Sequence, residues 1–180
     1  MKKAIIALSL ICISSIVSAQ TFTLTSNSVG GQATNTQVFN GFGCSGENIS
    51  PQLSWSNAPA GTKSFAITIY DPDAPTGSGW WHWVMFDIPS TINELKAGAR
   101  DVSKGIAPQG SIQSITDMGT TGFGGPCPPE GDGPHRYIVT LYALKTDKLG
   151  LDKTANPALV GFNLNHQVIE KASLIFYYQR

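Results

Sequence analysis

The sequence predicts an all-β fold of two packed sheets with few helices. About seven or eight short segments alternate apolar and polar residues with the period of a strand, and one segment has a clear helical period. Turns rich in Gly and Pro separate these strands, which favours antiparallel sheets over helix-connected ones. Of the 180 residues, 41% are hydrophobic and 13% charged, enough apolar material for one core in a single domain.

Residues 1–19 are predicted to be a signal peptide that is cleaved from the domain formed by residues 20–180. Lys2 and Lys3 give a basic start, the apolar run 4–17 is too short to span a bilayer comfortably, and Val17-Ser18-Ala19 supplies small residues before Gln20. Removing the two lysines leaves 10 basic against 12 acidic residues, a net charge of −2. We therefore expect a periplasmic or secreted protein without a transmembrane segment in its mature chain, and without affinity for nucleic acid.

The cysteine count supports an oxidising compartment. The chain has three cysteines, and Cys12 leaves with the signal peptide, so that Cys44 and Cys127 remain. We predict a Cys44–Cys127 disulfide, with two buried free thiols as the alternative.

The first half of the chain is predicted to contain four strands, at 22–26, 36–39, 52–56 and 63–70. The segment 63–70 is the strongest, because both of its faces are apolar, which is typical of a central strand. It ends directly at Asp71. Three glycines within 40–46 predict an irregular loop there.

The second half is predicted to contain strong strands at 82–88 and 135–144, a short strand at 111–116 within a long loop, and a closing strand at 174–178. A helical turn is expected at 91–97, and a helical segment is expected to open at 157–160. The most convincing helix spans 164–172, where Leu164, Val168 and Ala172 recur at every fourth position.

Two dense stretches carry the residues suited to chemistry. The first runs from Asp71-Pro72-Asp73-Ala74-Pro75 to Gly79-Trp80-Trp81-His82-Trp83, and the second from Gly124-Gly125-Pro126-Cys127-Pro128-Pro129 to His135-Arg136-Tyr137. If their strands are neighbours in register, Asp71, His82 and His135 meet at one edge of the sheet, and Tyr137 points the same way.

Some side chains of these stretches are expected to have structural roles. Arg136 should pair with an acid, one of the three tryptophans should face the pocket, and Asp71-Pro72 is a candidate cis bond. His166 is expected to be a partly exposed residue of the helix, away from both stretches.

Two imidazoles beside a carboxylate suit an anion site, a zinc or iron site, or a hydrolytic base. The sequence has no Gly-x-Ser-x-Gly, HExxH or CxxC motif, so anion or small-ligand binding is favoured over a metal site and over catalysis. A structural hydrogen-bond cluster stays open as an alternative. We expect no cofactor, no metal and no enzymatic activity.

These two stretches, together with Asn48-Ile49-Ser50-Pro51-Gln52-Leu53-Ser54-Trp55, resemble motifs of the phosphatidylethanolamine-binding protein family and its bacterial Raf-kinase-inhibitor-like branch. The resemblance implies a large antiparallel sheet packed on a smaller one. It also implies a pocket for phosphate-like and carboxylate anions, including phospholipid head groups. The matching pocket residues are Asp71, His82, Pro128, His135 and Tyr137.

The same resemblance implies a binding protein for a small anion and a homodimer, and the predicted signal peptide makes this a secreted protein. Cys127 departs from the pattern, because other branches have a glycine there. The alternative function is a modulator of a protein partner, similar to a kinase or protease inhibitor, which acts through surface outside the pocket and involves the segment 99–120.

Overall fold

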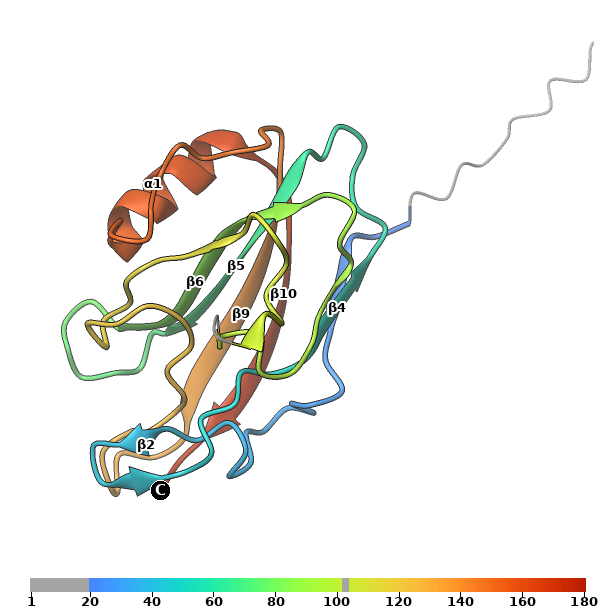
Figure 1. Ribbon diagram of the computed structural model, residues 1–180. Coiled ribbons are helices and arrows are strands. Elements are labelled where there is room, and N and C mark those ends of the chain that lie inside the picture. The colour runs from blue at the N-terminus through green and yellow to red at the C-terminus, as the bar shows by residue number, and fades with distance from the viewer. Residues whose placement is uncertain (1–19, 102–103) are drawn as a thin grey trace, which may run out of the picture.

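The computed structural model describes residues 20–101 and 104–180, so the predicted signal peptide lies outside the described residues (Figure 1). This part of the chain forms ten strands and one α-helix. In chain order they are β1 (Thr23–Thr25), β2 (Asn40–Gly41), β3 (Cys44–Ser45), β4 (Leu53–Ser56), β5 (Ser64–Asp71), β6 (Trp80–Pro89), β7 (Glu94–Leu95), β8 (Ile112–Gln113), β9 (His135–Leu144), α1 (Pro157–Gln167) and β10 (Val168–Tyr178).

The main sheet has five antiparallel strands in the order β10-β9-β5-β6-β8. Strand β5 lies at its centre, as its two apolar faces predict. Phe65, Ile67 and Ile69 of β5 join the larger core cluster on one face, and Ala66 joins a second cluster on the other. The sheet is thus buried on both sides along β5, which explains the continuous apolar run.

The small sheet, the main sheet and the helix form three layers. The small sheet β1-β4-β7 packs on one face of the main sheet, and α1 covers part of the opposite face (Figure 1). Val160 and Leu164 are the buried residues of α1 that pack with Phe86 of β6. A large antiparallel sheet packed on a smaller one, with one helix near the C-terminus, confirms the predicted fold class.

The helix begins at the predicted opening at 157–160, but it ends earlier than the helix predicted at 164–172. It begins at Pro157, where the side chain of Asn156 accepts a hydrogen bond from Leu159 N, and it ends at Gln167. Residues 168–172 instead begin β10. The prediction was wrong because residues four apart share a face in a strand as well as in a helix, so the spacing of Val168 and Ala172 does not distinguish the two.

Three local predictions were also wrong. Residues 36–39 belong to a turn closed by Gln37 N and Thr34 O, not to a strand. The expected helical turn at 91–97 holds β7, where Leu95 pairs with Leu53 of β4. The Asp71–Pro72 bond is trans.

The glycine-rich loop at 40–46 contains a short hairpin, β2-β3, that turns through Phe42 and Gly43, both with positive φ. In the described part of the chain, no helix is long and apolar enough to cross a bilayer.

Candidate functional site

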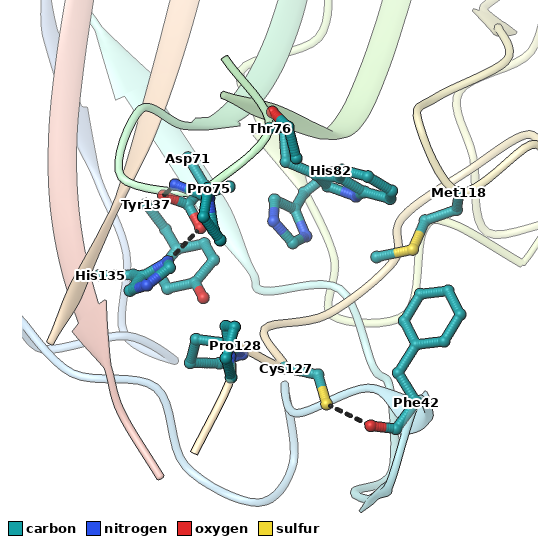
Figure 2. Close-up of a pocket in the computed structure, with 13 residues that line it drawn as sticks. Phe42, Asp71, Pro75, Thr76, His82, Met118, Cys127, Pro128, His135 and Tyr137 are labelled. Atoms are coloured by element: carbon teal, nitrogen blue, oxygen red, sulfur yellow. Dashed lines mark hydrogen bonds and ion pairs between the residues drawn. The ribbon is translucent and has the colours of Figure 1, made fainter. Parts of the chain in front are cut away.

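A cavity of about 220 Å³ opens where β5 ends and where β6 and β9 begin (Figure 2). Asp71 is the last residue of β5. Because β5 lies between β9 and β6, the strands that carry His135 and His82 flank it and are not direct neighbours. The cavity is lined by Phe42, Asp71, Ala74, Pro75, Thr76, Trp80, His82, Met118, Cys127, Pro128, Pro129, His135 and Tyr137. All five residues predicted to bind a ligand therefore meet at one site.

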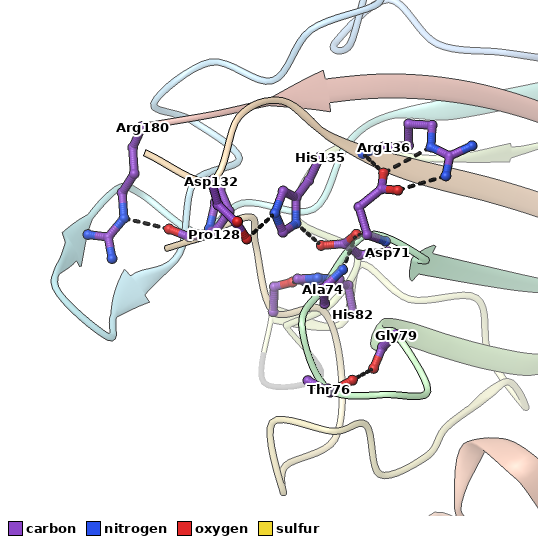
Figure 3. Close-up of polar contacts among 12 residues, drawn as sticks. Asp71, Ala74, Thr76, Gly79, His82, Pro128, Asp132, His135, Arg136 and Arg180 are labelled. Atoms are coloured by element: carbon purple, nitrogen blue, oxygen red, sulfur yellow. Dashed lines mark hydrogen bonds and ion pairs between the residues drawn. The ribbon is translucent and has the colours of Figure 1, made fainter. Parts of the chain in front are cut away.

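Asp71 shapes the loop that follows it and orients His135. Its Oδ1 accepts hydrogen bonds from the backbone N–H groups of Asp73 (2.8 Å) and Ala74 (3.1 Å), an arrangement typical of an aspartate that opens a turn. Its Oδ2 lies 2.7 Å from His135 Nδ1 (Figure 3). One buried carboxylate thus connects the end of β5 with the start of β9.

His135 is held between two carboxylates. Its Nε2 lies 3.1 Å from Asp132 Oδ2, on the side opposite Asp71 (Figure 3). Because carboxylates only accept, both ring nitrogens donate and the ring is an imidazolium. Burial opposes this charge, but the hydrogen bonds that Asp71 and Asp132 accept outweigh it and raise the pKa of His135 above its usual value. Neither N–H of His135 remains for a ligand, so this residue forms a wall of the pocket.

His82 reaches the same face through a β-bulge. Tyr70 pairs with Trp81 while Ile69 pairs with Trp83, so His82 is the extra residue of β6 at this point. Its freed carbonyl accepts from Gly124 N (2.8 Å), and its Nδ1 donates to Gly124 O (2.7 Å). His82 therefore anchors the loop of the second stretch as well as lining the pocket.

The same contacts determine the state of the His82 ring. A proton on Nδ1 leaves the lone pair of the neutral ring on Nε2. Burial is the largest influence on the ring and lowers the pKa of His82. The pocket thus contains one charged and one neutral imidazole.

Tyr137 lies against the floor of the cavity (Figure 2). Its ring stacks on Phe176 with centroids 5.2 Å apart and meets His82 edge-on at 5.1 Å. The residue is 1% exposed, and among the described residues its Oη has no hydrogen-bond partner. Burial raises the pKa of Tyr137, so the hydroxyl stays protonated and can donate.

Of the three tryptophans in the first stretch, only Trp80 lines the pocket, which confirms that prediction. Its Nε1 is also buried without a partner in the described part of the chain. Trp83 lies fully in the core, and Trp81 packs against Tyr70 with ring centroids 4.5 Å apart.

The loops at the mouth are tied together. The predicted Cys44–Cys127 disulfide is confirmed, with Cα atoms 6.1 Å apart and a sequence separation of 83. Arg180 Nε donates to Pro128 O at 2.6 Å (Figure 3), and its guanidinium is 3.4 Å from Phe42 O. Phe42 stands 65% exposed at the mouth. Arg180 was not predicted as part of this site.

Asn48 gives a role to the N-terminal motif. Its Oδ1 accepts from Gly125 N at 2.8 Å, 77 residues away in the sequence. A Cβ on Gly125 would lie 1.9 Å from Gln37 O, so only glycine allows the loop to pass this close. The motif therefore positions the second stretch from outside the pocket.

Arg136 pairs with Asp73, which confirms the prediction that Arg136 has an acidic partner. Nε and a terminal nitrogen of Arg136 lie 2.9 and 2.7 Å from the two oxygens of Asp73, and Arg136 N donates to the same carboxylate (2.8 Å). The side-chain hydrogen bond from Arg136 is the main reason that the pKa of Asp73 falls to about 2. This pair ties the loop after β5 to β9 (Figure 3).

His166 lies away from the pocket, as predicted. His166 is exposed on α1, and its Nδ1 donates to Phe162 O at 2.8 Å. Within 20–101 and 104–180, no group of three or more His, Cys, Asp or Glu side chains could hold a metal ion. Asp132 was missed by the sequence reasoning, although its place between Gly131 and Gly133, three residues before His135, is a signal for it.

Comparison with known proteins gives consistent matches. The chain is 49% identical over 183 residues to YbcL of Escherichia coli, with 99% of each chain covered, and 46% identical over 147 residues to YbhB of the same organism. The crystal structure of YbcL, described as a member of the mammalian PEBP family, superposes with a TM-score of 0.86 over 88% of this chain and 98% of that one. The homologue CT736 of Chlamydia trachomatis superposes with a TM-score of 0.73 at 27% identity over 88% of this chain and 97% of that one.

The sequence profile of the phosphatidylethanolamine-binding protein family matches residues 29–179, which cover both dense stretches and the motif around Asn48. With this match, the 49% identity to YbcL and the shared fold, the chain belongs to the phosphatidylethanolamine-binding protein family.

Proposed function

We propose that this chain is an exported, non-enzymatic binding protein whose pocket holds a small anion, such as phosphate, a phospholipid head group or a carboxylate. The observation that carries the proposal is Tyr137 Oη, a protonated hydroxyl on the cavity floor that has no partner among the described residues. An unsatisfied buried donor costs roughly 1–3 kcal/mol. An acceptor atom of a ligand would remove that cost.

Further features of the cavity support a small ligand with an acceptor. Trp80 Nε1 is a second donor without a partner in the described part. The volume of about 220 Å³ lies below the range of roughly 300–1,000 Å³ that is usual for drug-sized ligands. These features favour a head group or free anion over a whole lipid.

The side chains around the cavity support binding over catalysis. Cys127 is in the disulfide, and Thr76 Oγ1 donates to Gly79 O. Both nitrogens of His135 already donate to carboxylates. A hydrolytic site needs a nucleophile within reach of a free base, and these contacts occupy the Cys127 sulfur and the Thr76 hydroxyl, so that the free Nε2 of His82 has neither of them as a nucleophile to activate.

The proposal is tested with Tyr137→Phe, which removes only the hydroxyl. Acetate, inorganic phosphate and phosphoethanolamine are titrated by calorimetry, while the ring resonances of His82 and His135 are followed by NMR. Because hydrogen bonds to charged groups contribute about 1.5–3 kcal/mol, we expect Tyr137→Phe to weaken binding roughly 10- to 150-fold. Without ligand, the variant should be as stable as the wild type or more stable, since a desolvated donor is gone.

Tyr142→Phe is the matched control. Tyr142 lies on β9 as well, but it packs against the cluster under α1, on the other side of the sheet. The Tyr142→Phe variant should therefore have the same anion affinity as the wild type. If none of the three anions shifts the resonances of His82 or His135 at millimolar concentration, the pocket is not an anion site.

A further inference from the structure

The charges around the pocket do not match an incoming anion. Among the residues that the structure describes, no lysine or arginine lines the cavity. Arg136 and Arg180 lie nearby, but Arg136 is paired with Asp73, and Arg180 donates to backbone carbonyls at the mouth and lies 3.8 Å from Glu130. The site therefore offers no free fixed cation to a ligand.

Carboxylates outnumber the cation that is present. Asp71 and Asp132 flank the imidazolium of His135, and the negative charge of Asp117, whose Oδ2 accepts from Trp81 N at 2.8 Å, also acts on His82. Three carboxylates and one imidazolium leave a net charge of −2 around the site. An anion that enters with no compensating charge is repelled by this field.

His82 is the group that can supply the compensation. It is 4% exposed, lines the cavity, and faces Asp71 on β5, Tyr137 and His135 on β9, and Asp117 in the loop after β8. Its Nδ1 is committed to Gly124 O, so Nε2 carries the lone pair. Burial keeps the ring neutral in the absence of a ligand, because it lowers the pKa of His82.

We propose that anion binding at this pocket requires one proton between His82 Nε2 and the ligand, taken up from solvent where the ligand has no acidic proton, and that the pocket thereby prefers anions of low charge or with an acidic proton over fixed dianions. This inference rests on the proposed function. For acetate, the proton comes from solvent and forms an N–H bond at Nε2, while no bond in the ligand breaks. Hydrogen phosphate can supply its own proton, because its O–H donates to the same lone pair.

Calorimetry of the full mature chain measures the coupling directly. Acetate is titrated at one pH in buffers that differ in enthalpy of ionisation, and the dependence of the heat on the buffer gives the number of protons exchanged. We expect uptake of about one proton per acetate, and an apparent Kd that rises about tenfold per pH unit between the pKa of His82 in the free protein and its higher pKa in the complex. Sulfate, which carries no proton at these pH values, should bind at least about tenfold more weakly than phosphate.

Two further measurements assign the proton. NMR of histidine labelled with ¹⁵N should show the His82 ring change from neutral to imidazolium when acetate binds near neutral pH. His82→Gln should abolish proton uptake and the pH dependence of acetate affinity, while His166→Gln, at an exposed position of α1, should change neither.

The outcomes separate this inference from the proposed function. Failure of every anion to bind overturns the proposed function itself. Binding of acetate with no proton uptake overturns the inference alone, as does a His82 ring that stays neutral in the acetate complex of the wild type. The last measurement needs no variant, so it holds even if His82→Gln does not fold. Sulfate that binds as tightly as phosphate overturns the selectivity.

Discussion

At the scale of single residues, the pocket is organised by Asp71. It accepts hydrogen bonds from the two backbone N–H groups that follow it and from His135. The result is a wall made of Asp71, His135 and Asp132, which leaves Tyr137, His82 and Trp80 as polar side chains that can meet a ligand. Removal of Asp71 would leave the His135 charge with a single, half-exposed partner.

The contact between His135 and Asp132 predicts how stability depends on pH. The pKa of His135 is raised in the folded protein, so its contribution to stability is fully present below the unfolded value of 6.5 and is lost as the pH rises through the folded pKa. Because the Asp132 side chain is 42% exposed, we expect Asp132→Asn to lower the free energy of unfolding by only about 0.5–1 kcal/mol at roughly pH 6.

Urea denaturation at a series of pH values checks this prediction. The difference between Asp132→Asn and the wild type should shrink as the pH rises through the raised pKa that His135 has in the folded protein. Asp147→Asn, at an exposed acid in the loop after β9, should show no such trend. A difference that grows with pH would contradict a charged His135.

At the scale of elements, the bulge at His82 and three loop contacts assemble the site. The bulge turns His82 toward Tyr137 and frees its carbonyl for Gly124. Asn48 holds Gly125, and the disulfide holds Cys127. Each contact joins the loop at 124–129 to a different part of the chain, so the pocket wall depends on elements far apart in sequence.

The disulfide should contribute strongly to stability. In the chain-entropy account, a bridge that spans 83 residues restricts the unfolded chain by roughly 2–5 kcal/mol. We expect the double variant Cys44→Ser/Cys127→Ser to have a free energy of unfolding, measured by chemical denaturation, that is lower than that of the wild type by an amount within this range. Treatment of the wild type with reductant should lower the free energy of unfolding by the same amount. Phe42→Ser, an exposed position next to the bridge, is the control and should not lower it.

The anion affinity of the double variant should fall less than its stability, since Cys127 lines only the mouth of the cavity. Wild-type stability that is insensitive to reductant would contradict a bridge in the folded protein.

At the scale of the whole molecule, the described residues form two packed sheets, the β2-β3 hairpin and a helix, and the pocket lies at the end of the central strand of the main sheet. The disulfide suits an oxidising compartment, and we propose export to the periplasm or beyond through cleavage before Gln20. We expect protein recovered from its own host to have the intact mass of residues 20–180 less two hydrogens, and reductant should restore these two hydrogens. A protein that keeps residues 1–19 would contradict the cleavage.

The sequence by itself determined the sheet architecture and most of the site. The apolar residues on both faces of 63–70 reflect burial of both sides of β5, and the alternation at 135–144 reflects the one face that β9 buries along most of its length, so both strands were predictable. Asp71, His82, His135 and Tyr137 were predictable from their places at the ends of strong strands, and Pro128 from the resemblance of the second stretch to a family motif. The cysteine pair was predictable from composition and compartment.

Only the tertiary structure decided the features that depend on contacts between distant segments. The period of four from Leu164 to Ala172 suits a helix and a strand equally, and pairing of β10 with β9 selects the strand from Val168 onward. The bulge at His82 shifts register by one residue, which no pattern of polarity indicates. Asp132 occupies the second ring nitrogen of His135, and Gly124 O fixes the tautomer of His82. These contacts leave His82 Nε2 and the Tyr137 hydroxyl available to a ligand. Charge and hydrogen-bond capacity are set by neighbours in space, so the residues of the pocket were predictable from the sequence but their protonation states were not.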